Sequence, residues 1–378
     1  MSDEIAKRVY KDLGVKPVIN AAGSLTMLGG SRLSPGVREA MEAANRYFVD
    51  MKTLLQESGS VIAKMLGCEA AMVTPGCAST LSLGAAACMT GNDIEKLDQL
   101  PDTTGLKGKF IVQSLQRYKY DRCLTIFGGR SEEVGNTQGT TAPQLHAAID
   151  EETSAVLCVA PGDRKGVVPI EEVISIAGNK GVPVIVDAAS EVYPHERMRR
   201  YTDMGADIVG MGAKYFGSCN STGLMCGRKN LVDAAFLHSF ISFETDGYRA
   251  VGRPMKVDRQ EVIATVTALR EWMEMDHEAR FVEADRRTGL IREGLTQIPH
   301  IEVIPVKEER GLGNGLRIRV DEEGLGKTIA EIVEELHQGD PDIWVWYGKA
   351  NLSVAVHSLT DEDAAIVRDR LREVLRSP

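Results

Sequence analysis

Between residues 69 and 228 the sequence alternates short apolar runs with stretches of helical pattern, and this order restricts the fold more than any other feature. It is typical of an α/β sheet in which helices connect neighbouring strands. Few of the apolar runs alternate in polarity, which indicates strands that are buried on both faces. The strands predicted here are Ala70–Val73, Phe110–Gln113, Ala155–Val159, Val182–Val186, Ala206–Val209 and Gly223–Cys226, with helices that include Ala78–Cys88 and Ile170–Ala177.

The pattern changes to long helices after Arg228, and we predict one connecting helix at Glu261–Phe281. Beyond Pro299 strands and helices alternate again, which predicts a second, smaller α/β unit. The division we expect is an N-terminal segment 1–50 that completes the small domain, a large domain 51–255, and a connecting helix with the small C-terminal domain at 256–378. In the small domain we expect strands at Glu302–Pro305, Leu316–Val320, Ile343–Trp346 and Leu352–Val356, and helices at Lys327–Leu336 and Asp361–Leu375.

Composition narrows the class of protein. The 378 residues carry a formal net charge of −10, which argues against a nucleic-acid partner, because phosphate backbones are bound by clustered Lys and Arg. Seven cysteines without metal-type or disulfide-type spacing fit a reducing compartment. No apolar stretch approaches the roughly 18 residues that span a bilayer, and the charged N-terminus lacks a signal-peptide core. The seven histidines show no ligand spacing. We therefore expect a cytoplasmic protein with no membrane association. The sequence indicates no metal-ligating residue, and any metal requirement remains open.

Two ionisable residues follow predicted strands of the large domain. Asp187 closes the run 182–186, and Lys214 follows the run that begins at Ala206. Side chains at the carboxyl ends of parallel strands converge on one crevice, so this carboxylate and this amine can meet one heterocycle. Such a pair suits pyridoxal phosphate, because the acid keeps the pyridine nitrogen protonated and the amine holds the aldehyde as a Schiff base. The alternative is a helix-capping Asp and a solvated surface Lys.

A possible phosphate cradle lies at residues 74–80. The segment follows a strand and opens a helix rich in Ala and Leu, and its small residues allow a phosphate to approach backbone amides at the positive end of the helix dipole. The expected donors are Gly76, Cys77 and Ala78. An ordinary Pro-Gly turn is the alternative. The sequence has no Gly-x-Gly-x-x-Gly and no Walker lysine motif, so it gives no support to nicotinamide or nucleoside triphosphate binding.

With cradle, Asp and Lys in this order, the sequence resembles fold-type I pyridoxal phosphate enzymes, more narrowly the selenocysteine synthase and D-glucosaminate-6-phosphate ammonia-lyase family. The resemblance covers most of the chain and is carried by several ordered matches. They lie at residues 18–23, 28–31, 69–74, 100–105, 183–189 and 241–256. It implies a large domain with a mainly parallel seven-stranded sheet and a small C-terminal α/β domain. It also implies active sites shared across a homodimer or higher homo-oligomer.

The resemblance implies roles for individual residues. Lys214 would bind the cofactor aldehyde, Asp187 the pyridine nitrogen, and Gly76, Cys77 and Ala78 the phosphate. Gln116 would pack on the cofactor, and Ser221 and Thr222 would reach the cofactor phosphate of a neighbouring subunit. The substrate would contact Asn20, Ser31, Arg253, Lys256 and Trp346. The alternatives are a solvated surface role for Lys256 and a place in the core of the small domain for Trp346.

Four departures from the family lie near the proposed site. Gln116 stands where lyase-like relatives tend to have a His, and an amide cannot act as an acid or base. Met211 replaces a common Ser, and residues 215–220 lack the usual Gly-Pro-Gln turn. Trp346 stands where relatives tend to have an Arg suited to a carboxylate or phosphate. These changes keep the residues expected to act on the cofactor and alter the surroundings of the substrate.

The function expected is therefore a pyridoxal phosphate lyase acting on an amino acid or amino-sugar acid through an α-carbanion, with β-elimination and ammonia release. Racemisation, aldol cleavage and β-substitution remain open, because they use the same or a related carbanion. A non-catalytic protein that binds the cofactor or a metabolite is the alternative from another class. In each case the expected ligand is a small molecule.

Overall fold

The computed structural model describes residues 3–307 and 314–376. The chain divides into two compact units, a larger one of residues 32–274 and a smaller one in which residues 1–31 join residues 275–378. The sequence-based division placed these boundaries at 50/51 and 255/256. Among the described residues, no helix is long and apolar enough to cross a membrane.

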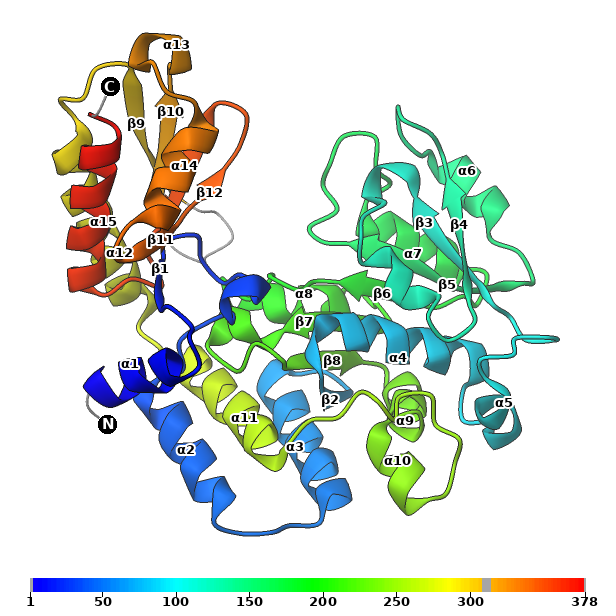
Figure 1. Ribbon diagram of the computed structural model, residues 1–378. Coiled ribbons are helices and arrows are strands. Elements are labelled where there is room, and N and C mark those ends of the chain that lie inside the picture. Colours follow the sequence, from blue (N-terminus) through cyan, green and yellow to red (C-terminus); the bar gives the residue numbers. More distant parts are fainter. Residues whose placement is uncertain (1–2, 308–313, 377–378) are drawn as a thin grey trace. The chain divides into compact units, whose positions relative to one another are not determined.

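The larger unit contains a seven-stranded sheet with the order β2-β8-β7-β6-β5-β3-β4 (Figure 1). Strand β8 runs antiparallel to both of its neighbours, and the other neighbouring pairs are parallel. The predicted α/β fold with a mainly parallel sheet is thus confirmed. The strands are β2 (Ala70–Thr74), β3 (Lys109–Gln113), β4 (Arg130–Val134), β5 (Thr153–Val159), β6 (Val184–Asp187), β7 (Ile208–Gly212) and β8 (Gly223–Gly227).

Strand β4 is the one strand of this sheet that the sequence did not predict. It lies at the edge, where it pairs with β3 alone, and only Val134 is buried. Its sequence, Arg-Ser-Glu-Glu-Val, is polar because an edge strand faces solvent on more sides than a central strand. By contrast, β3, β6, β7 and β8 are buried along their whole length, which produced the apolar runs.

Helix α4 (Gly76–Thr90) packs across strands β5 to β8 of the sheet (Figure 1). It is buried along most of its length, with Leu81 and Leu83 in the core. Gly84 lets it approach the sheet closely, since a Cβ there would lie 3.1 Å from Ile208 Cδ1. The other helices of the unit are α2 (Pro35–Asn45), α3 (Met51–Leu66), α5 (Ile94–Gln99), α6 (Ala142–Ala148), α7 (Ile170–Gly178), α8 (Glu196–Asp203), α9 (Lys229–Leu237), α10 (Phe240–Thr245) and α11 (Arg259–Glu274), with 3-10 turns η2 (Ser114–Gln116), η3 (Asp121–Leu124) and η4 (Ala213–Phe216).

The smaller unit contains two sheets. The N-terminal β1 (Val18–Asn20) pairs in parallel with β11 (Asp342–Trp344). An antiparallel sheet has the order β12 (Trp346–Tyr347), β13 (Asn351–Ala355), β10 (Gly315–Val320) and β9 (Ile301–Val306). The helices are α1 (Asp3–Asp12), α12 (His277–Leu295), α13 (Glu322–Leu325), α14 (Ile329–Gln338) and α15 (Asp361–Val374), with the 3-10 turn η1 (Thr26–Leu28). Apolar residues of both sheets and of α12, α14 and α15 form one core.

Two predicted elements are wrong in detail. The single connecting helix at 261–281 is two helices, because Asp276 ends the continuity and caps α12, its side chain accepting from the Ala279 N–H at 3.0 Å. The single strand at 343–346 is also divided, with Trp344 in β11 and Trp346 in β12, which belong to different sheets.

Candidate active site

Asp187 is the last residue of β6 and lies almost fully buried, with 7% of its surface exposed. Three donors hold its carboxylate. Oδ1 accepts from the Cys77 thiol at 3.3 Å and from the Ala189 N–H at 3.0 Å, and Oδ2 accepts from the Tyr118 hydroxyl. In the described part of the chain no cationic side chain forms an ion pair with it. Within the described residues, the site therefore presents a buried carboxylate that is hydrogen-bonded but forms no ion pair.

Lys214 lies on η4, directly after β7, which is the neighbour of β6. The register pairs Asp187 with Gly210, and the Gly212 N–H donates to the Ala189 carbonyl at 2.9 Å, so the chain beyond each strand leaves the same edge of the sheet. The Nζ lies 5.2 Å from the ring centroid of Tyr215. Burial lowers the pKa of the Lys214 amine, which favours the neutral form required of a nucleophile or base.

The cradle forms at the start of α4. Gly76 has φ +83°, and in the described structure no side chain caps the helix, whose N-cap residue is Pro75. The backbone of this turn packs tightly against β8, since a Cβ at Gly223 would lie 2.6 Å from the Gly76 carbonyl carbon and 2.7 Å from the Cys77 nitrogen. The backbone amides in the first turn of α4 have no capping side chain in the described structure, so they are suited to bind an anion.

Gln116 ends η2 and is buried. Both ends of its amide bind the main chain of β5, with Nε2 donating to the Val159 carbonyl at 3.0 Å and Oε1 accepting from the Val159 N–H at 3.3 Å. Its side chain is thus fixed between the ends of β3 and β5. The amide is held at both ends by the main chain of β5 and offers no acid or base.

Several known proteins are similar to this chain in sequence or in structure. No family model matches the chain. The chain is 32% identical to a 5'-C-glycyluridine monooxygenase-decarboxylase of a Streptomyces species, over 97% of this chain and 92% of that protein. It is 27% identical to a D-glucosaminate-6-phosphate ammonia lyase of Salmonella typhimurium over 97% of each. A solved structure of a D-glucosaminate-6-phosphate ammonia-lyase superposes on this chain with a TM-score of 0.85 at 26% identity. The superposition covers 97% of this chain and 98% of the lyase chain.

The chain belongs to the fold-type I pyridoxal phosphate enzymes. It is an enzyme of this family by similarity along its whole length, and the resemblance predicted from the sequence is confirmed. The residues described above fit the family's cofactor. The uncapped turn at Gly76 suits a phosphate, and the buried Asp187 carboxylate lacks the cationic partner that a protonated pyridine would supply. Lys214 offers a desolvated amine for the aldehyde.

Ser221 and Thr222, expected at the phosphate of a neighbouring subunit, already have partners within this chain. The exposed Ser221 donates its hydroxyl to Glu261 Oε1, and its carbonyl lies beside Gly76. Thr222 is buried, and its hydroxyl donates to the Cys219 carbonyl at 3.0 Å. Binding of a phosphate by either hydroxyl would require it to exchange these partners.

The predicted substrate residues are divided between the two units. In the larger unit, Arg253 pairs with Glu244 at 2.5 Å, and Lys256 is exposed. In the smaller unit, the Asn20 amide closes its own turn, accepting from the Ala22 N–H at 3.0 Å and donating to the Gly23 carbonyl at 2.7 Å.

Ser31 is partly buried, and Trp346 is 52% exposed on β12. Their roles toward a substrate remain predictions.

The sequence reasoning missed Tyr118 and Tyr215, the two tyrosines near Asp187. Tyr118 binds its carboxylate, and Tyr120 packs edge-on against Tyr118, with ring centroids 5.7 Å apart. Tyr215 lies over Gly212, whose absent Cβ would be 3.1 Å from the ring. Burial first, and then the charge of Asp187, raise the pKa values of Tyr118 and Tyr215. One signal was present, since Tyr118 comes directly after Gln116-Arg117 beyond a strand end.

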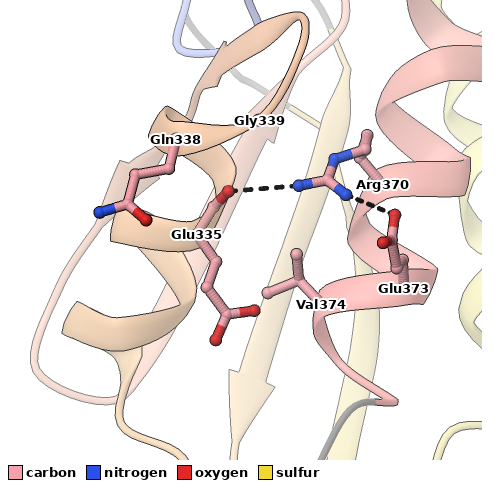
Figure 2. A pocket seen from close by; sticks show the side chains of 6 residues that line it. All are labelled: Glu335, Gln338, Gly339, Arg370, Glu373 and Val374. Carbon is pink, nitrogen blue, oxygen red and sulfur yellow. Dashed lines mark hydrogen bonds and ion pairs between the residues drawn. The ribbon is translucent and has the colours of Figure 1, made fainter.

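A separate cavity of about 240 Å³ lies in the smaller unit, between α14 and α15 (Figure 2). Arg370 crosses it, donating to the Glu335 carbonyl at 3.3 Å and to the Glu373 carboxylate. Its lining contains none of the residues predicted for the active site.

Proposed function

We propose that this protein is a pyridoxal phosphate-dependent lyase that eliminates a β-substituent from an amino acid or amino-sugar acid and releases ammonia. The observation that carries the proposal is the buried Asp187 carboxylate at the end of β6, which pairs with β7, the strand that leads directly to Lys214. The similarity to the ammonia-lyase over nearly the whole of both chains supports the same chemistry. When bound, the cofactor withdraws electrons from the bonds at the substrate's α-carbon.

The residues of this chain would then act at stated atoms. Lys214 Nζ removes the α-proton, and its lowered pKa keeps more of the free amine neutral near pH 7. Asp187 would hold the pyridine nitrogen, and the amides of Gly76, Cys77 and Ala78 would hold the phosphate. The electron pair left by the α-proton forms the Cα–Cβ double bond as the β-group leaves, and hydrolysis of the product gives a 2-oxo acid and ammonia.

The experiment is an assay of the purified protein loaded with pyridoxal phosphate, using D-glucosaminate 6-phosphate and measuring ammonia and 2-oxo acid together. Equal amounts of both products are expected, and the K214A variant should form both about 10²- to 10⁴-fold more slowly. Binding of the cofactor without either product would refute the lyase on this substrate. Chiral analysis of recovered substrate and assay for aldehyde products then test racemisation and aldol cleavage.

A second candidate is oxygen-dependent decarboxylation, the activity in the name of the Streptomyces relative. The higher identity to that protein favours it, and so does Gln116. The Gln116 side chain is an amide, which cannot protonate a leaving group, and hydrogen bonds to Val159 hold it in this position. Oxygen consumption and carbon dioxide release with 5'-C-glycyluridine, without ammonia from the phosphorylated sugar acid, would select this function.

We also propose that the protein is a homodimer or higher homo-oligomer of the cytoplasm. Three consecutive apolar residues between α2 and α3, Tyr47, Phe48 and Val49, are 73%, 94% and 50% exposed. Such a run on a soluble enzyme is typical of a surface that a partner covers. Sedimentation of the purified protein tests the oligomeric state.

A further inference from the structure

Groups of this protein already occupy most of the hydrogen-bond acceptor positions of the Asp187 carboxylate. A carboxylate offers about four acceptor positions. Two on Oδ1 are taken by the Cys77 thiol and the Ala189 N–H, and one on Oδ2 is taken by the Tyr118 hydroxyl. The remaining position lies on Oδ2, so the orientation of the carboxylate decides where an incoming donor must stand.

The two side-chain donors, Cys77 and Tyr118, come from different segments at the edge of the sheet. Neighbouring residues hold each of them in position. Cys77 lies in the first turn of α4, and its thiol fits because Gly210 has no side chain, since a Cβ there would lie 2.9 Å from Sγ. Tyr118 follows η2, and its N–H donates to Asp121 at 3.3 Å.

The Tyr118 segment is itself anchored. The same Asp121 carboxylate is 3% exposed and pairs with Arg117 Nε at 2.5 Å, while Arg117 also binds Glu133 at 3.0 Å. The Tyr118 hydroxyl is therefore delivered to Asp187 by a fixed loop. An accidental contact of a mobile side chain would have no such support.

Both groups act as donors. Burial and the nearby Asp187 charge raise the pKa values of the Cys77 thiol and the Tyr118 phenol, which keeps their protons in place. Each group therefore donates a hydrogen bond to the Asp187 carboxylate.

We propose that Tyr118 and Cys77 are positioning residues, which orient the Asp187 carboxylate so that its remaining acceptor position meets the pyridine nitrogen of pyridoxal phosphate. The proposal rests on the cofactor assigned above and is independent of the reaction catalysed. It adds to the phosphate cradle a second role for Cys77, whose side chain serves Asp187 while its main chain serves the phosphate.

The test measures the dissociation constant of pyridoxal phosphate by equilibrium dialysis, without substrate, for the full chain and its Tyr118→Phe variant. Loss of one hydrogen bond to a charged group should weaken binding about tenfold or more. With cofactor labelled with nitrogen-15 in the ring, the pH at which the pyridine nitrogen loses its proton should also shift. Tyr120→Phe is the matched control, since Tyr120 contacts Tyr118 through its ring edge, and it should bind as the wild type does.

Cys77→Ala and Cys77→Ser provide an independent pair. Alanine removes the donor and should weaken binding, whereas serine retains a hydroxyl donor and should restore most of it. Circular dichroism shows whether each variant is folded. If Tyr118→Phe does not fold, the two Cys77 variants still test whether a side-chain donor to Asp187 supports cofactor binding. If Tyr118→Phe binds the cofactor as tightly as the wild type or more tightly, the hydroxyl competes with the cofactor for Asp187 and the proposal is overturned. Failure of the lyase assay with normal cofactor binding would leave this inference intact.

Discussion

Lys214 is the residue on which catalysis should depend most directly. Its amine is partly desolvated, which lowers its pKa and increases the share of the neutral amine that can act as a base. Replacement by alanine should reduce kcat by about 10²- to 10⁴-fold, the usual contribution of a positioned general base. Added methylamine should restore part of the activity, with a pH dependence that follows the pKa of the added amine. Turnover by the variant at the wild-type rate would show that another group removes the proton.

His238 should make stability depend on pH. It is fully buried beside Thr90, with Nε2 and Oγ1 2.8 Å apart, and burial lowers its pKa to about 4. The unfolded chain takes up this proton at higher pH than the folded chain does, so stability falls as pH drops from about 6.5 through about 4. The expected loss is roughly 3 kcal/mol. Urea unfolding of His238→Gln should show a flatter profile over this range, and the exposed His146→Gln should follow the wild type.

At the scale of elements, the turn between β2 and α4 depends on the absence of a side chain on β8. Gly223→Ala would place a Cβ 2.6 Å from the Gly76 carbonyl carbon. The clash is with main-chain atoms, so either β8 or the turn at Gly76 would have to move. We expect destabilisation of about 2 kcal/mol or more and weaker cofactor binding. Gly178→Ala in α7 is the control, because nothing lies within 4 Å of its Cβ, and it should stabilise by about 0.5–1 kcal/mol. Equal melting temperatures for the two variants would contradict the packing argument.

Elements buried on both faces were predictable from sequence, and this explains which candidate site residues were assigned to the correct elements. Asp187 and Lys214 were placed correctly at the ends of β6 and β7 because those strands are continuous apolar runs. The edge strand β4 was missed because its exposure removes that signal. Tyr118 was missed for another reason, since its contact with Asp187 joins residues 69 apart in sequence, and no local pattern encodes such a contact. Helix ends were misjudged where a cap, as at Asp276, divides a continuous pattern.

At the scale of the whole molecule, assembly should depend on the exposed segment 47–49. Phe48 is 94% exposed, and in the described structure its ring contacts the Arg259 guanidinium at 5.0 Å from the centroid. Burial of such a ring in a partner surface contributes strongly to association, and aromatic residues commonly dominate an interface.

Phe48→Glu should therefore weaken self-association by about tenfold or more while leaving the fold of each subunit intact, because the side chain is exposed in the single chain. Sedimentation velocity over a dilution series measures the change. Ile126→Glu is the control, a residue of the same unit that is 53% exposed and lies beyond η3, and it should associate as the wild type does. Under the proposed assembly, with active sites shared between subunits, the dissociated variant should also lose activity in parallel with dissociation. A Phe48→Glu protein that stays assembled at every concentration would exclude segment 47–49 from the interface.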